Sequence, residues 1–355
     1  MFGSELPGFE DFFLEREPSR DKSPDPEVVR GKVPGRAPDS DDGLTHAPEP
    51  VWPWSYRDQF EAAVPFGPKT ERAKDLIHAY DARILEEMES VGGVASYVER
   101  YPELEDAFTD EKPCLCCMDE RRAAGTFRVP GSGILLKDEE KAAFRAELKA
   151  VGIKQVYTHT GCGAVQAFAA AHPELSTGKT DDEIARAYGT TLAAELGIEY
   201  GGHAKISGDH PGRAAYYDAT GRLDTGNAAW QEWMPAGFSI TRRILTAEQA
   251  MDALVLAVKI AFSEQYEAEG ALSDDQVKKS GLAFTKENPF ALIYVAKPGE
   301  SGVDSTFSAD VLRAELERCR AAIEAAVPES AGKIRIDGFT APARPFHQAA
   351  ESQAA

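Results

Sequence analysis

The chain has 355 residues, 43% of them hydrophobic, which is enough to bury a full core and to form more than one domain-sized unit. Lys and Arg total 39 against 59 Asp and Glu, a net charge of −20, which argues against a nucleic acid or an anionic membrane as partner. The amino terminus lacks the basic and apolar regions of a signal peptide, and the odd count of five cysteines favours a reducing compartment, so we expect a cytoplasmic protein.

The first third of the chain divides into two segments by composition. Residues 1–52 are rich in proline and acid and contain few apolar residues, so we predict a largely irregular arm. Residues 53–110 are predicted to form an N-terminal helical segment. From Lys69 to Ser90 the apolar residues follow helical spacing, and Gly92-Gly93 ends the pattern. The apolar faces of these helices must pack against something, and a neighbouring subunit is one candidate.

Residues 111–235 alternate between strand and helix patterns. Asp138 is a candidate N-cap for one helix, and the capping box Thr180-Asp181-Asp182-Glu183 opens another. Short connections between these elements predict an α/β fold with a mostly parallel sheet flanked by helices. Strands are expected near residues 114–118, 125–131, 155–159, 203–207 and 213–218.

Residues 236–355 are predicted to be a C-terminal α/β extension. A second capping box at Thr246 opens a long helix, whose most apolar part, 253–262, is too short to span a bilayer and contains a lysine. A strand at 291–295, a helix ending near Val327 and a further strand at 333–336 follow. The segment has no copy of the Cys/His pattern formed by Cys117, His159 and Cys162. It could be an oligomerisation element, a degenerate second lobe or a docking surface.

Cys117, His159 and Cys162 are candidate metal ligands. Cys117 and His159 end two short apolar runs of the kind that form buried parallel strands, and Cys162 opens the helix after the second run. Because ligands gather beyond the carboxyl ends of parallel strands, these side chains should meet there. Two thiolates and one imidazole predict one zinc ion per chain, and three protein ligands with a fourth position open are typical of catalytic zinc.

Asp119 and Arg121 follow Cys117 at spacings that suit catalysis. Residues two apart in an extended chain share a face, so Asp119 can lie on the metal side. Arg121 would keep Asp119 ionised and fix its orientation. Zinc lowers the pKa of bound water from about 16 toward roughly 7. Asp119 could accept a hydrogen bond from the resulting zinc-bound hydroxide, or displace the water as a fourth ligand.

The sequence Cys-x-Asp-x-Arg from Cys117, followed by His-x-x-Cys-Gly from His159, resembles the β-class carbonic anhydrases. Residues 127–133 look like a degenerate form of that family's Arg-Asn-x-Gly-Asn turn, and residues 216–223 resemble its late strand, so the likeness covers about residues 110–225. The resemblance implies a β-carbonic-anhydrase-like fold. It also implies zinc bound by Cys117, His159 and Cys162, and a catalytic dyad of Asp119 and Arg121.

The implied activity is that of a zinc lyase that interconverts carbon dioxide and bicarbonate. The family also implies a homodimer or larger homo-oligomer. The chain departs from the family pattern in two places: the distance from Cys117 to His159 (159 − 117 = 42 residues) is short, and Pro130 stands where the motif has asparagine. The second departure bears on the shape of the substrate pocket.

Four other interpretations stay open from the sequence. Cys114 or Cys116 could complete a closed structural zinc site, or Cys114 and Cys117 could form a redox pair. A hydrolase acting on carbonyl sulfide or carbon disulfide could use the same ligands, because those substrates are also small and linear. A protein with no activity could use the zinc as a stabiliser of an interaction scaffold.

Overall fold

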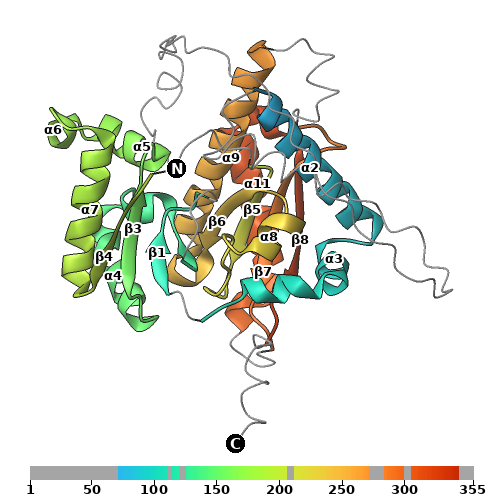
Figure 1. Cartoon of the computed structure of the whole chain (residues 1–355), viewed down its shortest axis with the longest axis horizontal. Coiled ribbons are helices and arrows are strands. Elements are labelled where there is room, and N and C mark those ends of the chain that lie inside the picture. The colour runs from blue at the N-terminus through green and yellow to red at the C-terminus, as the bar shows by residue number, and fades with distance from the viewer. Residues whose placement is uncertain are drawn as a thin grey trace, which may run out of the picture. The chain divides into compact units, whose positions relative to one another are not determined.

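Two four-stranded sheets carry the fold, and all the strand pairings within them are parallel (Figure 1). The computed structural model describes residues 71–110, 113–119, 125–205, 212–271, 284–299 and 305–343. The predicted arm, residues 1–52, lies outside them, as does Arg121. The first sheet has the order β2-β1-β3-β4 and the second β6-β5-β7-β8, which confirms the prediction of an α/β fold with parallel strands.

The strands of the first sheet are β1 (Cys114–Cys116), β2 (Phe127–Arg128), β3 (Gln155–His159) and β4 (Glu199–Ala204). Those of the second are β5 (Ala214–Asp218), β6 (Gly237–Thr241), β7 (Phe290–Ala296) and β8 (Ile334–Thr340). The described helices are α2 (Glu71–Ser90), α3 (Val94–Arg100), α4 (Asp138–Ala150), α5 (Gly163–Ala171), α6 (Pro173–Ser176), α7 (Asp181–Leu196), α8 (Ala228–Trp233), α9 (Ala247–Ala271) and α11 (Ala309–Ala326).

Local sequence signals set several of the helix ends. Thr180 accepts a hydrogen bond from the backbone of Glu183 and closes a capping box at the start of α7, which ends at Gly197 in the left-handed conformation. The helix predicted to have Asp138 as its N-cap begins one residue earlier than expected: Asp138 is its first residue and Lys137 is the N-cap. In the described residues we find no helix with both the length and the apolar character needed to cross a membrane.

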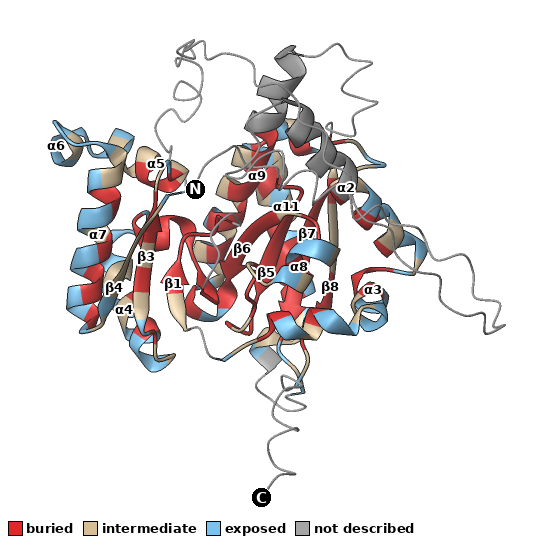
Figure 2. Cartoon of the chain, viewed as in Figure 1, coloured by how far each residue is buried: buried red, intermediate tan, exposed pale blue. Residues whose placement is uncertain are grey.

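Helices cover both faces of the second sheet (Figure 2). One face packs against α9 and α11 in a large apolar cluster that also includes the core of the first sheet. The other face packs against α2, α3 and α8, with Trp230 at its centre. All seven residues of β7 are buried, as expected for a central parallel strand with helices on both sides.

The second sheet repeats the topology of the first. In each half, the first two strands are followed by a 3-10 turn, a helix, a third strand, further helix and a fourth strand that lies at the outer edge. The 3-10 turns are η3 (Pro130–Gly133) and η4 (Arg242–Ile244). β5, which the sequence places within the 111–235 segment, belongs to the second sheet.

The strand registers show which residues correspond between the halves. Leu115 pairs with Phe127 and Val156, and Ala215 pairs with Phe238 and Leu292, so Leu115 matches Ala215. All six face the same apolar cluster. Counting along the strands from these matches, Tyr217 stands in place of Cys117, Arg242 in place of Gly131 and Val295 in place of His159. The second half therefore repeats the fold without the metal ligands.

Candidate metal centre

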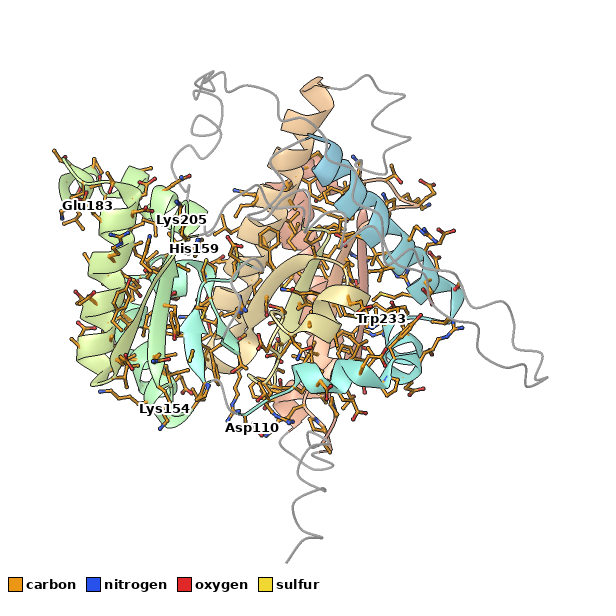
Figure 3. All side chains as sticks on the ribbon, in the orientation of Figure 1. Asp110, Lys154, His159, Glu183, Lys205 and Trp233 are labelled. Atoms are coloured by element: carbon orange, nitrogen blue, oxygen red, sulfur yellow. The ribbon has the colours of Figure 1, made fainter. Side chains whose placement is uncertain are left out.

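Three buried side chains meet at the carboxyl ends of β1 and β3. Cys117 directly follows β1, His159 ends β3, and Cys162 is the N-cap of α5. Their ligand atoms all lie within 4.8 Å of one another. Figure 3 shows His159 at the opposite end of β3 from Lys154, which precedes the strand. The structure thus brings the three predicted ligands together, as expected for a parallel sheet.

His159 presents one ring nitrogen to the cluster. Its Nδ1 lies 2.9 Å from the carbonyl oxygen of Thr160, and because a carbonyl only accepts, Nδ1 carries the proton. In the neutral ring, Nε2 then carries the lone pair, and it lies close to the sulfur atoms of Cys117 and Cys162. This atom is buried and has no hydrogen-bond partner within the described structure. An unpartnered, buried imidazole nitrogen beside two thiols fits a metal ligand whose orientation is fixed by its other nitrogen.

One hydrogen bond joins the two thiols. Their sulfur atoms are 3.7 Å apart, and the hydrogen bond from Cys162 holds the pKa of Cys117 well below its usual value. The same bond raises the pKa of Cys162 well above its usual value. Burial lowers the pKa of His159, but the charges of Cys117 and Asp119 raise it overall. Because a metal displaces protons from its ligands, these groups fit a cation that takes the place of the proton in this hydrogen bond.

A tight turn after β2 supports Cys117. The backbone N–H of Gly131 donates to the Cys117 sulfur at 3.2 Å. Gly131 and Ser132 both have positive φ, 54° and 57°, and a Cβ at Gly131 would lie 2.6 Å from a methyl carbon of Ile134. The Ser132 hydroxyl donates to the carbonyl of Tyr157 at 2.7 Å, which holds this strained residue in place. The turn therefore requires glycine at position 131 and supplies a donor to the thiolate.

Asp119 lies beside the three ligands. Its side chain is 3% exposed, and its Oδ2 is 3.9 Å from Nε2 of His159. The structure thus places Asp119 next to His159, one of the three candidate ligands. Arg121, the other member of the predicted dyad, lies outside the described residues, so its pairing with Asp119 stays a prediction.

Cys114 and Cys116 are not part of the cluster. The Cys116 side chain packs against Gly125, because a Cβ at position 125 would lie 2.6 Å from the Cys116 sulfur. The Cys114 sulfur lies 3.7 Å from Oε1 of Gln155. None of the five cysteines, all of which are described, forms a disulfide bond. Among the described residues, nothing supports the closed zinc site or the redox pair.

The function must be inferred from these residues and their geometry. The chain matches no family model, no curated protein and no solved structure. Three candidate ligands, two from neighbouring strand ends and one from the start of a helix, have a buried carboxylate next to them, and these are the observations that bear on it.

His203, on β4 next to the site, forms a second polar cluster. Its Nδ1 is 2.8 Å from the Thr158 hydroxyl, its Nε2 is 3.5 Å from Asp182, and its side chain is 6% exposed. The Thr158 hydroxyl also bonds Tyr200 at 2.7 Å. His203 is thus a buried histidine whose Nδ1 is hydrogen-bonded, while its Nε2 has no hydrogen-bond partner within the described structure.

We expect His203 to make the fold sensitive to mild acid. Burial lowers its pKa below the usual value. The unfolded chain then binds a proton at higher pH than the folded chain, so stability is lost as the pH falls below about 6.5. Urea unfolding at pH 8 and pH 5 should show a smaller loss for His203→Asn than for the wild type. Metal release at pH 5 affects both proteins alike, so equal losses would contradict the assignment.

Proposed function

We propose that the protein is a zinc enzyme that interconverts carbon dioxide and bicarbonate. The observation that carries this proposal is the buried cluster of Cys117, His159 and Cys162 with the Asp119 carboxylate 3.9 Å from the histidine nitrogen. Two thiolates, one imidazole and a position left for solvent form the ligand set of catalytic zinc sites. A purely structural zinc has no use for a buried carboxylate at this place.

The side chains of the site divide the work among them. Cys117, His159 and Cys162 would hold the ion, which supplies Lewis acidity and lowers the pKa of coordinated water toward neutrality. The Gly131 N–H stabilises the Cys117 thiolate, and the Thr160 carbonyl fixes the tautomer of His159. Burial of all three ligands keeps bulk water from weakening these electrostatic interactions.

Asp119 is the group that handles the proton. A carboxylate at this position can accept a hydrogen bond from the attacking oxygen and orient it toward the carbon of the substrate. Arg121 would keep Asp119 ionised through an ion pair. These roles follow the resemblance to the β-class carbonic anhydrases, whose motif residues stand here at the ends of adjacent parallel strands. The family's fold, a homodimer or larger assembly and a cytoplasmic location belong to the same proposal.

The first test is zinc-dependent hydration of carbon dioxide. We expect purified protein to bind one zinc ion per chain and to catalyse hydration in a stopped-flow pH-indicator assay. Cys162→Ser should lose the zinc and the activity together, because one of three ligands is removed. Cys114→Ser is the matched control: its thiol lies outside the cluster, so zinc and activity should be kept.

Three outcomes would contradict the proposal. Zinc-loaded protein with no hydration activity would favour the interpretation as a zinc-stabilised scaffold. Sulfide release from carbonyl sulfide or carbon disulfide without hydration would favour the hydrolase. Loss of zinc in Cys114→Ser would indicate that Cys114 is a fourth ligand, as in a closed structural zinc site.

A further inference from the structure

The two peptide groups on either side of Asp119 are both held by hydrogen bonds. The carbonyl of Met118, which belongs to the peptide before Asp119, accepts from the backbone N–H of Ser239 at 2.9 Å. The carbonyl of Asp119, which belongs to the peptide after it, accepts from Nη1 of Arg128 at 2.9 Å. Fixing both peptide planes fixes φ and ψ of Asp119, and therefore the direction of the Cα–Cβ bond from which its carboxylate extends.

Arg128 is a buried cation that clamps the connection between β1 and β2. Its side chain is fully buried, which is rare for arginine and costly unless the charge is well hydrogen-bonded. Besides the Asp119 carbonyl, it donates through Nε to the Gly125 carbonyl at 3.2 Å. Asp119 and Gly125 flank the segment that contains Arg121. One guanidinium therefore ties the two ends of the connection that carries the predicted dyad.

β6 of the second sheet holds Arg128 in turn. The Thr241 hydroxyl accepts from the backbone N–H of Arg128 at 2.8 Å and donates to the carbonyl of Thr126 at 3.2 Å. Thr241 is fully buried, so these bonds are not exchanged with water. Ser239, which holds the Met118 carbonyl, lies on the same strand. The half of the chain without metal ligands thus provides two of the contacts that fix the half with them.

We propose that Arg128 and Thr241 are positioning residues for the reaction, acting through Asp119. This inference rests on the proposed hydration of carbon dioxide. Arg128 fixes the orientation of the peptide group after Asp119. Thr241 fixes the position of the backbone of β2, from which the Arg128 side chain extends to that peptide group. A carboxylate turned away from the metal leaves the ligands intact, so the loss should fall on turnover and not on metal binding. The second sheet therefore holds the backbone around Asp119 in place through β6.

Thr241→Val tests the role of the hydroxyl, because valine keeps the shape of threonine and removes both hydrogen bonds. We expect zinc content and KM for carbon dioxide to stay at wild-type values while kcat falls roughly 10- to 100-fold, the range for a small displacement of a catalytic group. Thr241→Ser, which restores the hydroxyl, should recover most of kcat. Arg128→Lys, which cannot bridge two carbonyls in the same way, should behave like Thr241→Val.

Ile240→Val, on the same strand and in the apolar core, controls for a general loss of stability. It should lower the melting temperature and leave kcat unchanged. Wild-type kcat in Thr241→Val would overturn the positioning role. So would a loss of kcat in Ile240→Val that stands in the same proportion to its loss of melting temperature as in Thr241→Val. A zinc-loaded wild type without hydration activity would instead overturn the proposed function, and the positioning role with it.

Discussion

Asp119→Ala is expected to keep a full complement of zinc and to lose hydration of carbon dioxide by about 10²- to 10⁴-fold, the usual contribution of a positioned acid–base group. The three ligand atoms lie within 4.8 Å of one another without any help from the carboxylate, so the metal should stay. The carboxylate next to them is the part that turnover needs. Zinc is measured by elemental analysis and turnover by stopped flow on the same preparation.

Two further variants sharpen this test. Asp119→Asn keeps the size of the side chain and removes its charge, so it should lose most of the activity if the negative charge is what matters. Asp182→Asn removes an acid beside His203, outside the metal cluster, and should leave the rate near the wild-type value. Hydration that persists in Asp119→Ala would show that the proposed mechanism is wrong. Loss of zinc in that variant would instead make Asp119 a ligand.

The meeting of the three candidate metal ligands could be predicted because the sequence signals for it are local. Each lies at the end of a short apolar run or at the start of a helix, and parallel strands bring such ends to one edge of a sheet. Cys117 and His159 needed only the correct strand assignment. The capping boxes at Thr180 and Thr246 were also found, because a capping box is a pattern within four residues.

The supporting contacts could not be predicted because they join residues far apart in the chain. Ser239 and Thr241 reach a loop that precedes them by more than a hundred residues. Their strand, β6, was not predicted, although Phe238 and Ile240 alternate with Gly237, Ser239 and Thr241 as in a strand, because only two apolar residues carry the pattern. All five side chains are buried, so the polar ones reflect contacts with the first half and not with solvent.

The repeated topology could not be predicted from the sequence for a related reason. A parallel sheet with covered faces requires apolar strands and amphipathic helices, and many sequences satisfy that pattern. The residues that would mark a repeat are the metal ligands, and the second half has replaced them. Tyr217 and Arg242 stand where Cys117 and Gly131 stand in the first half.

In the second half, an ion pair fills the position that corresponds to the metal site. Arg242 donates to Glu315 of α11 at 2.9 Å and 3.1 Å, and Tyr217 donates to the same carboxylate at 2.7 Å. Arg242 also donates to the Leu245 carbonyl and lies 5.7 Å above the ring of Phe307. Because the carboxylate and the guanidinium are paired this closely, removing one of them would leave the other as an uncompensated buried charge.

Glu315→Gln is expected to lower the free energy of unfolding by about 3–5 kcal/mol, the usual cost of leaving a buried charge without its partner. The amide keeps the size of the side chain but cannot neutralise Arg242, which is 9% exposed. Urea unfolding monitored by fluorescence measures the loss.

The triple variant Tyr217→Phe, Arg242→Met, Glu315→Leu separates the charge from the packing. It removes the pair and the hydroxyl together, and replacing a buried ion pair by apolar groups of similar volume is often neutral or stabilising. We therefore expect the triple variant to be more stable than Glu315→Gln, although it changes more residues. If Glu315→Gln cost less than about 1 kcal/mol, the pair would behave as a solvated surface contact. Its position in the core of the second half would then have no energetic consequence.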